Sequence, residues 1–357
     1  MTPADFLRKL VSIYSPSGRE EEVARFIVHT GKKLGYTTAL IDKLNNAILE
    51  IGPATATKTI VLLGHIDTVK GFLPVRMRDG VLTGRGTVDA KGPFAAFFFA
   101  ALAAAPKLKN VKIMVAGASS EETHGTGARA LADKIATPNA VIVGEPSDWA
   151  GITLGYKGIL IMEYYQKCPL KHSANESSDN VIESSIEFTE KIKDFVDAYN
   201  VGKTPWTSLQ RRVERFEYYE DDNWERVVIR MKFRTPIGFN HSDLRQAIAS
   251  SGGAGAEIGY TQSWGTEEAC LASKNSPVVR AFLPAIRAQG GEPTFKVKTG
   301  TADMNTFMKA FPGVPMVSYG PGDSTLDHTP EERLPIADLD KAVAVLTDVL
   351  VRLDETL

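Results

Sequence analysis

Short, fully apolar runs alternate with helical segments along roughly the first 155 residues of the chain. Three such runs, at residues 60–63, 112–116 and 141–144, are each bounded by Gly, Pro or polar residues, as buried strands are. Residues 92–105 are almost wholly apolar but too few to span a bilayer, so they are predicted to form a buried helix. A helix over residues 20–34 is predicted near the start, with Ser17 as its cap. The alternation predicts an α/β domain with a mostly parallel sheet.

The pattern changes near residue 156 and returns near residue 276. Between these points it is typical of a strand, a helix, two strands, a helix and a strand, at residues 159–166, 180–199, 215–219, 226–234, 241–250 and 257–264. This βαββαβ order predicts an inserted α+β domain. We therefore expect a discontinuous α/β domain of residues 1–157 and 273–357, split by an insert of residues 158–272.

The overall composition excludes several classes of protein. The 357 residues include 41 Lys and Arg against 43 Asp and Glu, and the formal charge of −2 excludes a strongly basic nucleic-acid binder. Cys168 and Cys270 are too few for a disulfide framework and too far apart for a CxxC site. The first eight residues lack the apolar segment of a secretion signal. These features predict a cytoplasmic protein that binds neither nucleic acid nor membrane.

Polar residues of catalytic character gather in five short segments, each at the end of a predicted buried strand or in the loop after one. The segments are GHIDT (64–68), GRGTVDAKG (84–92), SSEETHG (119–125), GEPS (144–147) and DHTPEE (327–332). Ligand sites in open α/β sheets lie at the carboxyl ends of the strands, so we expect these segments to meet at one edge. Their candidate metal ligands are His65, Asp89, Glu122, Glu145 and His328, a set that suits two zinc-like ions without any thiolate.

Each segment also has an ordinary structural explanation when it is taken alone. Asp89 precedes a helix and could be its cap, and His328 could be an exposed loop residue. Glu121 and Glu122 could lie in the first turn of a helix, where acidic residues are favoured. Two adjacent carboxylates nevertheless repel each other unless a cation lies between them. One of the pair could then bind the cation while the other accepts a proton from bound water.

The five segments, in this order, resemble the ArgE/DapE family of dinuclear zinc amidohydrolases and exopeptidases, and the resemblance extends over the whole chain. It implies a zinc-exopeptidase-like catalytic domain, with the insert as a lid or dimerisation domain. It also implies two divalent metal ions, Zn²⁺ by preference and Co²⁺ as an alternative. The implied ligands are His65 and Glu145 for one ion, Glu122 and His328 for the other, and Asp89 as the bridge between them.

The resemblance further implies roles for residues that do not bind metal. Asp67 would orient His65, and Glu121 would be the general base that acts on the metal-bridging water. His172, near the start of the insert, matches a lid histidine that reaches the partner subunit's active site in dimeric members and helps to hold the oxyanion. A homodimer is therefore implied as well. The peptide bond after Asp89 is expected to be cis, and the implied activity is hydrolysis of an amide bond.

The implied substrate depends on residues 295–305 (FKVKTGTADMN), which match the family's loop for the substrate carboxylate. This loop is most similar to that of the LysK group, which releases lysine or ornithine from the C-terminal glutamate of LysW, a small acidic amino-group carrier protein. The predicted substrate-binding residues are Lys157, Lys298, Gly300, Thr301 and Asn305. Ala302 replaces the serine that is usual at its position, which leaves the identity of the released amino acid open.

Basic residues near the motifs fit an acidic protein partner. They are Arg85, Lys157, Lys167, Lys171, Lys296, Lys298 and Lys309. Two other kinds of function stay open on the sequence. The chain could act on a small substrate, as an acetylornithine deacetylase, a succinyl-diaminopimelate desuccinylase, a dipeptidase or a carboxypeptidase does. It could also be a non-catalytic relative kept for binding.

Overall fold

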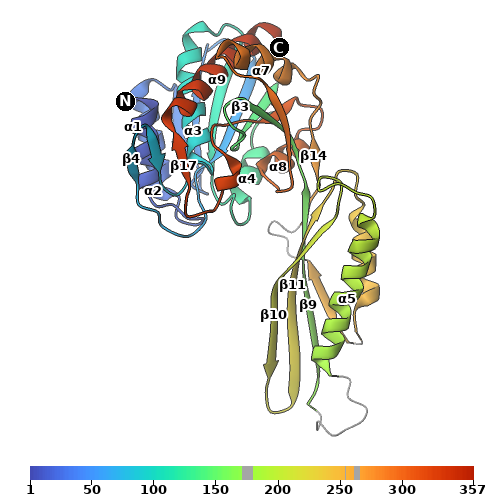
Figure 1. Ribbon diagram of the computed structural model, residues 1–357. Helices are drawn as coiled ribbons and strands as arrows, with labels where there is room; N and C mark the ends of the chain where they lie inside the picture. Colours follow the sequence, from blue (N-terminus) through green and yellow to red (C-terminus); the bar gives the residue numbers. More distant parts are fainter. Residues whose placement is uncertain (171–179, 254, 261–265) are drawn as a thin grey trace. The chain divides into compact units, whose positions relative to one another are not determined.

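The computed structural model describes residues 1–170, 180–253, 255–260 and 266–357, which form two compact units (Figure 1). The first unit comprises Met1–Gly155, Leu271–Val297 and Ala302–Leu357. The second comprises Tyr156–Cys270 and Lys298–Thr301, and therefore interrupts the first in sequence. The insert expected at residues 158–272 starts and ends two residues later than the long segment of the second unit.

A mixed sheet forms the middle of the first unit. Its strands follow the order β1-β2-β6-β3-β7-β16-β8-β14, and β15 pairs with β8. Their bounds are Thr38–Ile41 (β1), Ala47–Ile51 (β2), Lys58–His65 (β3), Val111–Ala118 (β6), Ala140–Gly144 (β7), Gly151–Tyr156 (β8), Cys270–Leu271 (β14), Thr294–Lys298 (β15) and Met316–Ser318 (β16). The neighbours β6, β3, β7 and β16 are parallel, whereas β1, β2 and β8 pair antiparallel. The predicted parallel strands thus lie at the centre of the sheet.

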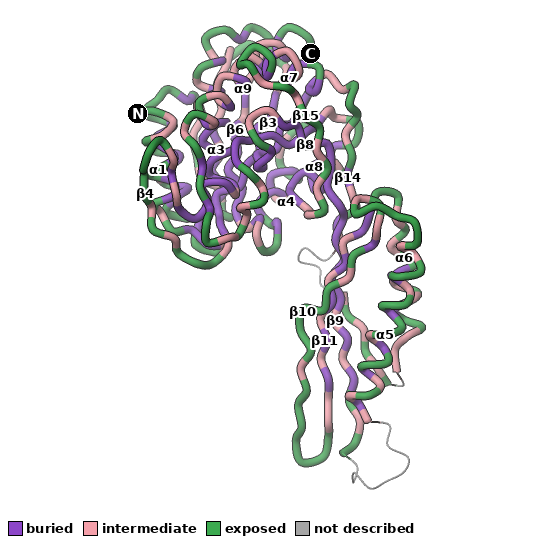
Figure 2. Tube along the Cα trace, viewed as in Figure 1, coloured by how far each residue is buried: buried purple, intermediate pink, exposed green. Residues whose placement is uncertain are grey.

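Helix α3 (Lys91–Ala104) is apolar all round and is buried along most of its length, as predicted for residues 92–105. It contacts β3, β6 and β7 of the sheet as well as the helices α1 (Pro3–Ser12) and α9 (Ile336–Thr356). Figure 2 shows this buried interior of the first unit. The other helices of this unit are α1 (Pro3–Ser12), α2 (Glu21–Leu34), η1 (Ala105–Lys107), α4 (Thr126–Ala132), α7 (Pro277–Ala288), α8 (Asp303–Ala310), η2 (Ser324–Leu326) and α9 (Ile336–Thr356). Over the described ranges, no helix combines the length and the apolarity needed to cross a membrane.

A small antiparallel sheet joins the C-terminal part of the first unit to the region before α3. It consists of β4 (Arg76–Arg78), β5 (Val81–Thr83) and β17 (Arg333–Pro335), in the order β17-β5-β4. Arg333 at the start of β17 pairs with Thr83 at the end of β5. The residues just before β17 therefore meet the glycine-rich loop just after β5.

The second unit is a two-layer α+β structure with the predicted βαββαβ order (Figure 1). The elements are β9 (Gly158–Pro169), α5 (Val181–Asn200), β10 (Gln210–Glu220), β11 (Trp224–Thr235), α6 (His241–Ser251) and β12 (Glu257–Tyr260). The antiparallel sheet has the order β10-β11-β9-β12, and the short β13 (Thr266–Glu267) pairs with β9. Helices and sheet share one core, which includes Tyr164, Phe188, Ile229 and Ile248.

The start of α2 differs from the prediction. Glu20, not Ser17, occupies the cap position, and its side chain forms no capping hydrogen bond there. Ser17 instead donates its hydroxyl to Asp67, 50 residues further along the chain, at 2.6 Å. A serine before a helix is a common cap, so the sequence could not show that this hydroxyl is used elsewhere.

Candidate metal centre

Three neighbouring parallel strands end at the candidate site. β6, β3 and β7 lie side by side in the sheet and run in the same direction. His65 is the last residue of β3, Glu121 and Glu122 come shortly after β6, and Glu145 comes directly after β7. These are the carboxyl ends of parallel strands, where the sequence predicted a ligand site.

Side chains from four of the predicted segments meet in one small group. The ligand atoms of His65, Asp89 and Glu122 all lie within 4.8 Å of one another. The Oδ1 atom of Asp89 lies 3.0 Å from Nε2 of His65, and its Oδ2 atom lies 3.0 Å from Nε2 of His328. The same nitrogen of His328 is 3.0 Å from a carboxylate oxygen of Glu122. Asp89 thus offers one oxygen to each imidazole.

The charges of this group fit a cation-binding site. Burial lowers the pKa of His65, but its contacts with Asp67 and Asp89 outweigh burial and hold this pKa well above the usual value. Contacts with Asp89 and Glu122 raise the pKa of His328 to about 10. The protons on the two imidazoles therefore balance the negative charge of the neighbouring carboxylates. Bound metal ions would balance the same charge in their place. Imidazole nitrogen and carboxylate oxygen are donors that suit Zn²⁺ and Co²⁺.

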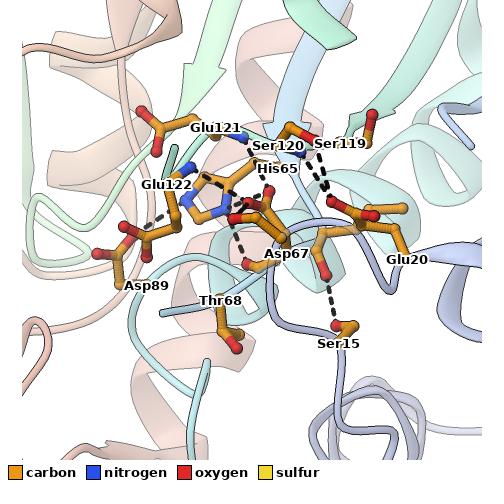
Figure 3. A network of polar contacts seen from close by, with 12 residues as sticks. Ser15, Glu20, His65, Asp67, Thr68, Asp89, Ser119, Ser120, Glu121 and Glu122 are labelled. Atoms are coloured by element: carbon orange, nitrogen blue, oxygen red, sulfur yellow. Dashed lines mark hydrogen bonds and ion pairs between the residues drawn. The ribbon is translucent and has the colours of Figure 1, made fainter. Parts of the chain in front are cut away.

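Asp67 holds the site together through both its backbone and its side chain (Figure 3). Its carbonyl oxygen lies 3.0 Å from Nδ1 of His65, whereas its carboxylate is 3.6 Å from that nitrogen. The carboxylate accepts the backbone N–H groups of Glu121 and Glu122, at 3.1 and 3.2 Å, and the hydroxyl of Ser17. Asp67 therefore fixes the turn of the two glutamates as well as the ring of His65.

Glu121 is buried beside the group. Burial raises the pKa of its carboxyl group well above the usual value, the charge of His65 lowers it, and the charges of Glu145 and Asp303 raise it further. Its side chain points away from the Asp67 carboxylate that accepts its N–H (Figure 3). A carboxyl group with a raised pKa is suited to accept and return a proton near neutral pH.

Comparison with known proteins identifies the family. The model of peptidase family M20/M25/M40 matches residues 61–352, which is most of the chain. The chain belongs to this family. Among M20 relatives, a [LysW]-lysine hydrolase of Deinococcus radiodurans is 38% identical over 355 residues, which cover 98% of this chain and 96% of that protein. A [LysW]-lysine/[LysW]-ornithine hydrolase of Sulfurisphaera tokodaii is 28% identical and covers 94% of this chain and 91% of its own.

Solved structures of M20 proteins share the fold. The metallo-carboxypeptidase Sso-CP2 from Sulfolobus solfataricus matches with a TM-score of 0.78 at 20% identity, over 100% of both chains. The YXEP protein of Bacillus subtilis, a dinuclear metal-binding peptidase of the M20 family, matches with a TM-score of 0.71 at 14% identity, over 99% of this chain and 98% of its own. The resemblance found in the five segments is thus confirmed, and this M20 chain is a hydrolase of amide bonds.

The turn before Glu121 in this M20 chain depends on a residue that the sequence did not single out. Ser120 has a φ of 60°, in the left-handed region that residues other than Gly rarely adopt. Glu20 accepts the N–H of Ser120 at 3.0 Å and its hydroxyl at 3.3 Å. Glu20, the residue just before α2, therefore stabilises the turn that sets the direction of Glu121. The peptide bond between Asp89 and Ala90 is cis, as expected.

Lys157, a predicted substrate-binding residue, is fully buried in the second unit. Its Nζ atom donates to the carbonyl oxygen of Ser208 at 2.6 Å, and burial lowers its pKa to about 8. Its backbone N–H donates to the carbonyl of Lys298, and its own carbonyl accepts the hydroxyl of Thr301. These contacts join three of the predicted residues, and they hold together the local fold of the second unit.

The remaining predicted residues differ in their surroundings. A Cβ atom built on Gly300 would meet no atom within 4 Å, so this position is open. In the first unit, Oδ1 of Asn305 accepts the backbone N–H of Ala302, the residue at the cap position of α8. Asn305 therefore stabilises the start of a helix whose cap residue has no hydroxyl to contribute. His172 lies outside the described residues.

Metal binding at this centre is expected to release protons and to tighten as the pH rises. The raised pKa values of His65 and His328 mean that both imidazoles are protonated at pH 7 in the metal-free protein. A ligand nitrogen must be unprotonated, so each proton released strengthens apparent binding about tenfold per pH unit below the pKa. Calorimetric titration with Zn²⁺ in buffers of different ionisation enthalpy measures the release directly. An affinity that stays constant between about pH 6 and 8 would contradict this prediction.

Proposed function

We propose that this M20 enzyme releases lysine, or a related amino acid such as ornithine, from the C-terminal glutamate of a LysW-type carrier protein. Relatives named for that activity match the chain almost from end to end. The hydrolytic part of the proposal rests on Asp89, whose two oxygens face different imidazoles, with Glu121 buried beside them. A small-molecule deacylase, a peptidase and a non-catalytic binding protein are less favoured, since the named relatives are carrier hydrolases.

We assign two divalent ions to the centre, Zn²⁺ first and Co²⁺ as the alternative. His65 and Glu145 would hold one ion and Glu122 and His328 the other, with Asp89 shared by both. When bound, two such ions lower the pKa of a water molecule and polarise the carbonyl group of the substrate. The adjacent carboxylates, which otherwise repel one another, support this assignment.

Glu121 is the proposed general base and acid of the reaction. Its carboxylate accepts a proton from the attacking water while the water oxygen bonds to the carbonyl carbon of the amide. Glu121 then gives this proton to the nitrogen of the leaving amine as the C–N bond breaks. The products are the carrier's free carboxylate and the free amino acid. The hydrogen bonds that the backbone N–H groups of Glu121 and Glu122 donate to the Asp67 carboxylate keep the base in place during both transfers.

An acidic carrier would be attracted to the enzyme by basic surface residues. Arg85 and Lys157 are not among them, because both are buried and bonded inside the protein, Arg85 to Glu332 and Lys157 to Ser208. Lys167 and Lys309 are exposed and remain candidates. The same proposal includes four further points. His172 donates a hydrogen bond to the oxyanion, and the second unit acts as a lid. The enzyme is a homodimer and is located in the cytoplasm.

A substrate panel tests this assignment. We expect the purified, zinc-loaded enzyme to release lysine or ornithine from LysW conjugates faster than it hydrolyses acetylornithine, succinyl-diaminopimelate or dipeptides. We also expect kcat/KM for the carrier substrate to fall steeply as salt is added, because salt screens exposed charges. Faster hydrolysis of any small substrate would contradict the carrier assignment. A flat response to salt would show that docking does not depend on charge.

A further inference from the structure

Glu332 is a buried residue whose side chain contacts the loop before α3. It is 1% exposed. Its Oε1 atom accepts the backbone N–H groups of Gly86 and Val88, both at 2.9 Å, and of Asp89 at 3.1 Å. Its Oε2 atom accepts a hydrogen bond from the guanidinium of Arg85 at 2.9 Å. Both oxygens of this carboxylate are therefore bonded to the loop that ends in Asp89.

The backbone of this loop is shaped to bind an anion. Several N–H groups that converge on one point form an anion-binding concavity. Gly84 and Gly86 have φ values of +147° and +89°, a region that glycine adopts without strain. A Cβ on Gly86 would also lie 2.9 Å from a side-chain atom of Thr68. The glycine-rich segment therefore builds an anion cradle, and the anion that occupies it is the chain's own Glu332.

The same contacts join two of the segments that form the metal centre. Glu332 and His328 belong to one short segment, DHTPEE, and Asp89 belongs to the glycine-rich one. Arg85 donates to the carbonyl oxygen of Thr329 at 3.1 Å as well as to Glu332. The two segments therefore also touch beside the 3.0 Å contact between Asp89 and His328.

We propose that Glu332 is a positioning residue of the metal centre, which holds Asp89 so that each of its oxygens faces a different metal site. The inference rests on the proposed function, because it requires Asp89 to be a ligand of both ions. Glutamine at this position would keep the size of the side chain but lose its charge. Its NH₂ group would face either Arg85 or the three backbone N–H groups. Either orientation would place two hydrogen-bond donors opposite each other, so a hydrogen bond would be lost. Asp89 would then lose its fixed backbone position.

The test measures metal binding rather than turnover, in metal-free wild-type protein and in E332Q. Calorimetric titration with Zn²⁺ gives the number of ions bound and their affinity, and the visible spectrum with Co²⁺ reports the geometry of the ligands. We expect E332Q to bind Zn²⁺ about 10- to 100-fold more weakly and to change the Co²⁺ spectrum. E331Q is the matched control, because Glu331 is the neighbouring carboxylate and is exposed. It should bind both ions as the wild type does.

Wild-type affinity together with an unchanged Co²⁺ spectrum in E332Q would overturn the inference. A wild-type protein that binds no Zn²⁺ would instead contradict the proposed function itself. If E332Q is too unstable to titrate without metal, the rise in its melting temperature at a fixed Zn²⁺ concentration distinguishes a positioning role from an effect on stability alone. A smaller rise than in the wild type supports positioning, because a weaker ligand stabilises the folded state less. An equal rise means that Glu332 acts on stability alone and overturns the inference.

Discussion

Replacing Glu121 by glutamine is expected to lower kcat by about 10²- to 10⁴-fold, because the amide can no longer accept the proton of the attacking water. The substitution preserves the size of the side chain, and it leaves the contacts among His65, Asp89 and His328 unchanged. Metal content should therefore equal that of the wild type, and KM should change little. Steady-state kinetics with the carrier substrate, combined with metal analysis of the same sample, measures both quantities.

Glu122 provides the matched control for this experiment. It is adjacent to Glu121, and the same Asp67 carboxylate accepts its backbone N–H. Its side chain lies 3.0 Å from His328, within the candidate ligand group. We therefore expect E122Q to lose metal and E121Q to keep it. Full turnover in E121Q would refute the role of Glu121 as base, and equal loss of metal in both variants would mean that Glu121 is itself a ligand.

Removing the metal with a chelator is expected to abolish hydrolysis, and adding Zn²⁺ or Co²⁺ is expected to restore it. Without the ions, the pKa of the attacking water returns from about 7 to its value in bulk water, so the nucleophile is no longer formed at neutral pH. The substitution D89N is expected to give a protein that added Zn²⁺ does not activate, because it removes the carboxylate that faces both imidazoles.

The melting temperature gives an independent measure of metal removal and rebinding. Ions that bind only the folded state stabilise it by about 2.7 kcal/mol at a free concentration of 100 times Kd. The chelated wild type should therefore melt at a lower temperature and recover when Zn²⁺ is added, whereas D89N should respond much less. Hydrolysis that survives complete removal of metal would rule out the proposed mechanism.

The sequence predicted the parts of the fold and the site that follow from local rules. Residues 92–105 are apolar all round, so their burial as a helix could be predicted from composition alone. His65, Glu122 and Glu145 follow apolar runs that had to be strands of one sheet, and this predicted that they would lie at one edge. The antiparallel strands β1 and β8 were harder to predict, because they are short or lack polar alternation.

Contacts between distant segments explain most of what the sequence left open. Glu332 was part of a recognised motif, but its three backbone partners lie more than 240 residues earlier in the chain. Ser17 presented the same difficulty, since a helix cap is the usual role for a serine at that position. The resemblance implied that Lys157 contacts the substrate, and the structure adds what the sequence could not show, that its ammonium group is buried and donates to Ser208.

His328 leaves the ribosome much later than the other side chains of the centre. Glu122 and His328 are 206 residues apart in the chain, and the long segment of the second unit, Tyr156–Cys270, is translated between them. At about 5–20 residues per second, this interval lasts roughly 10 to 40 s. The early strands can pair, and the second unit can fold, long before the last ligand exists. A nascent chain therefore lacks part of the proposed ligand set, and we expect metal loading to follow synthesis of nearly the whole polypeptide.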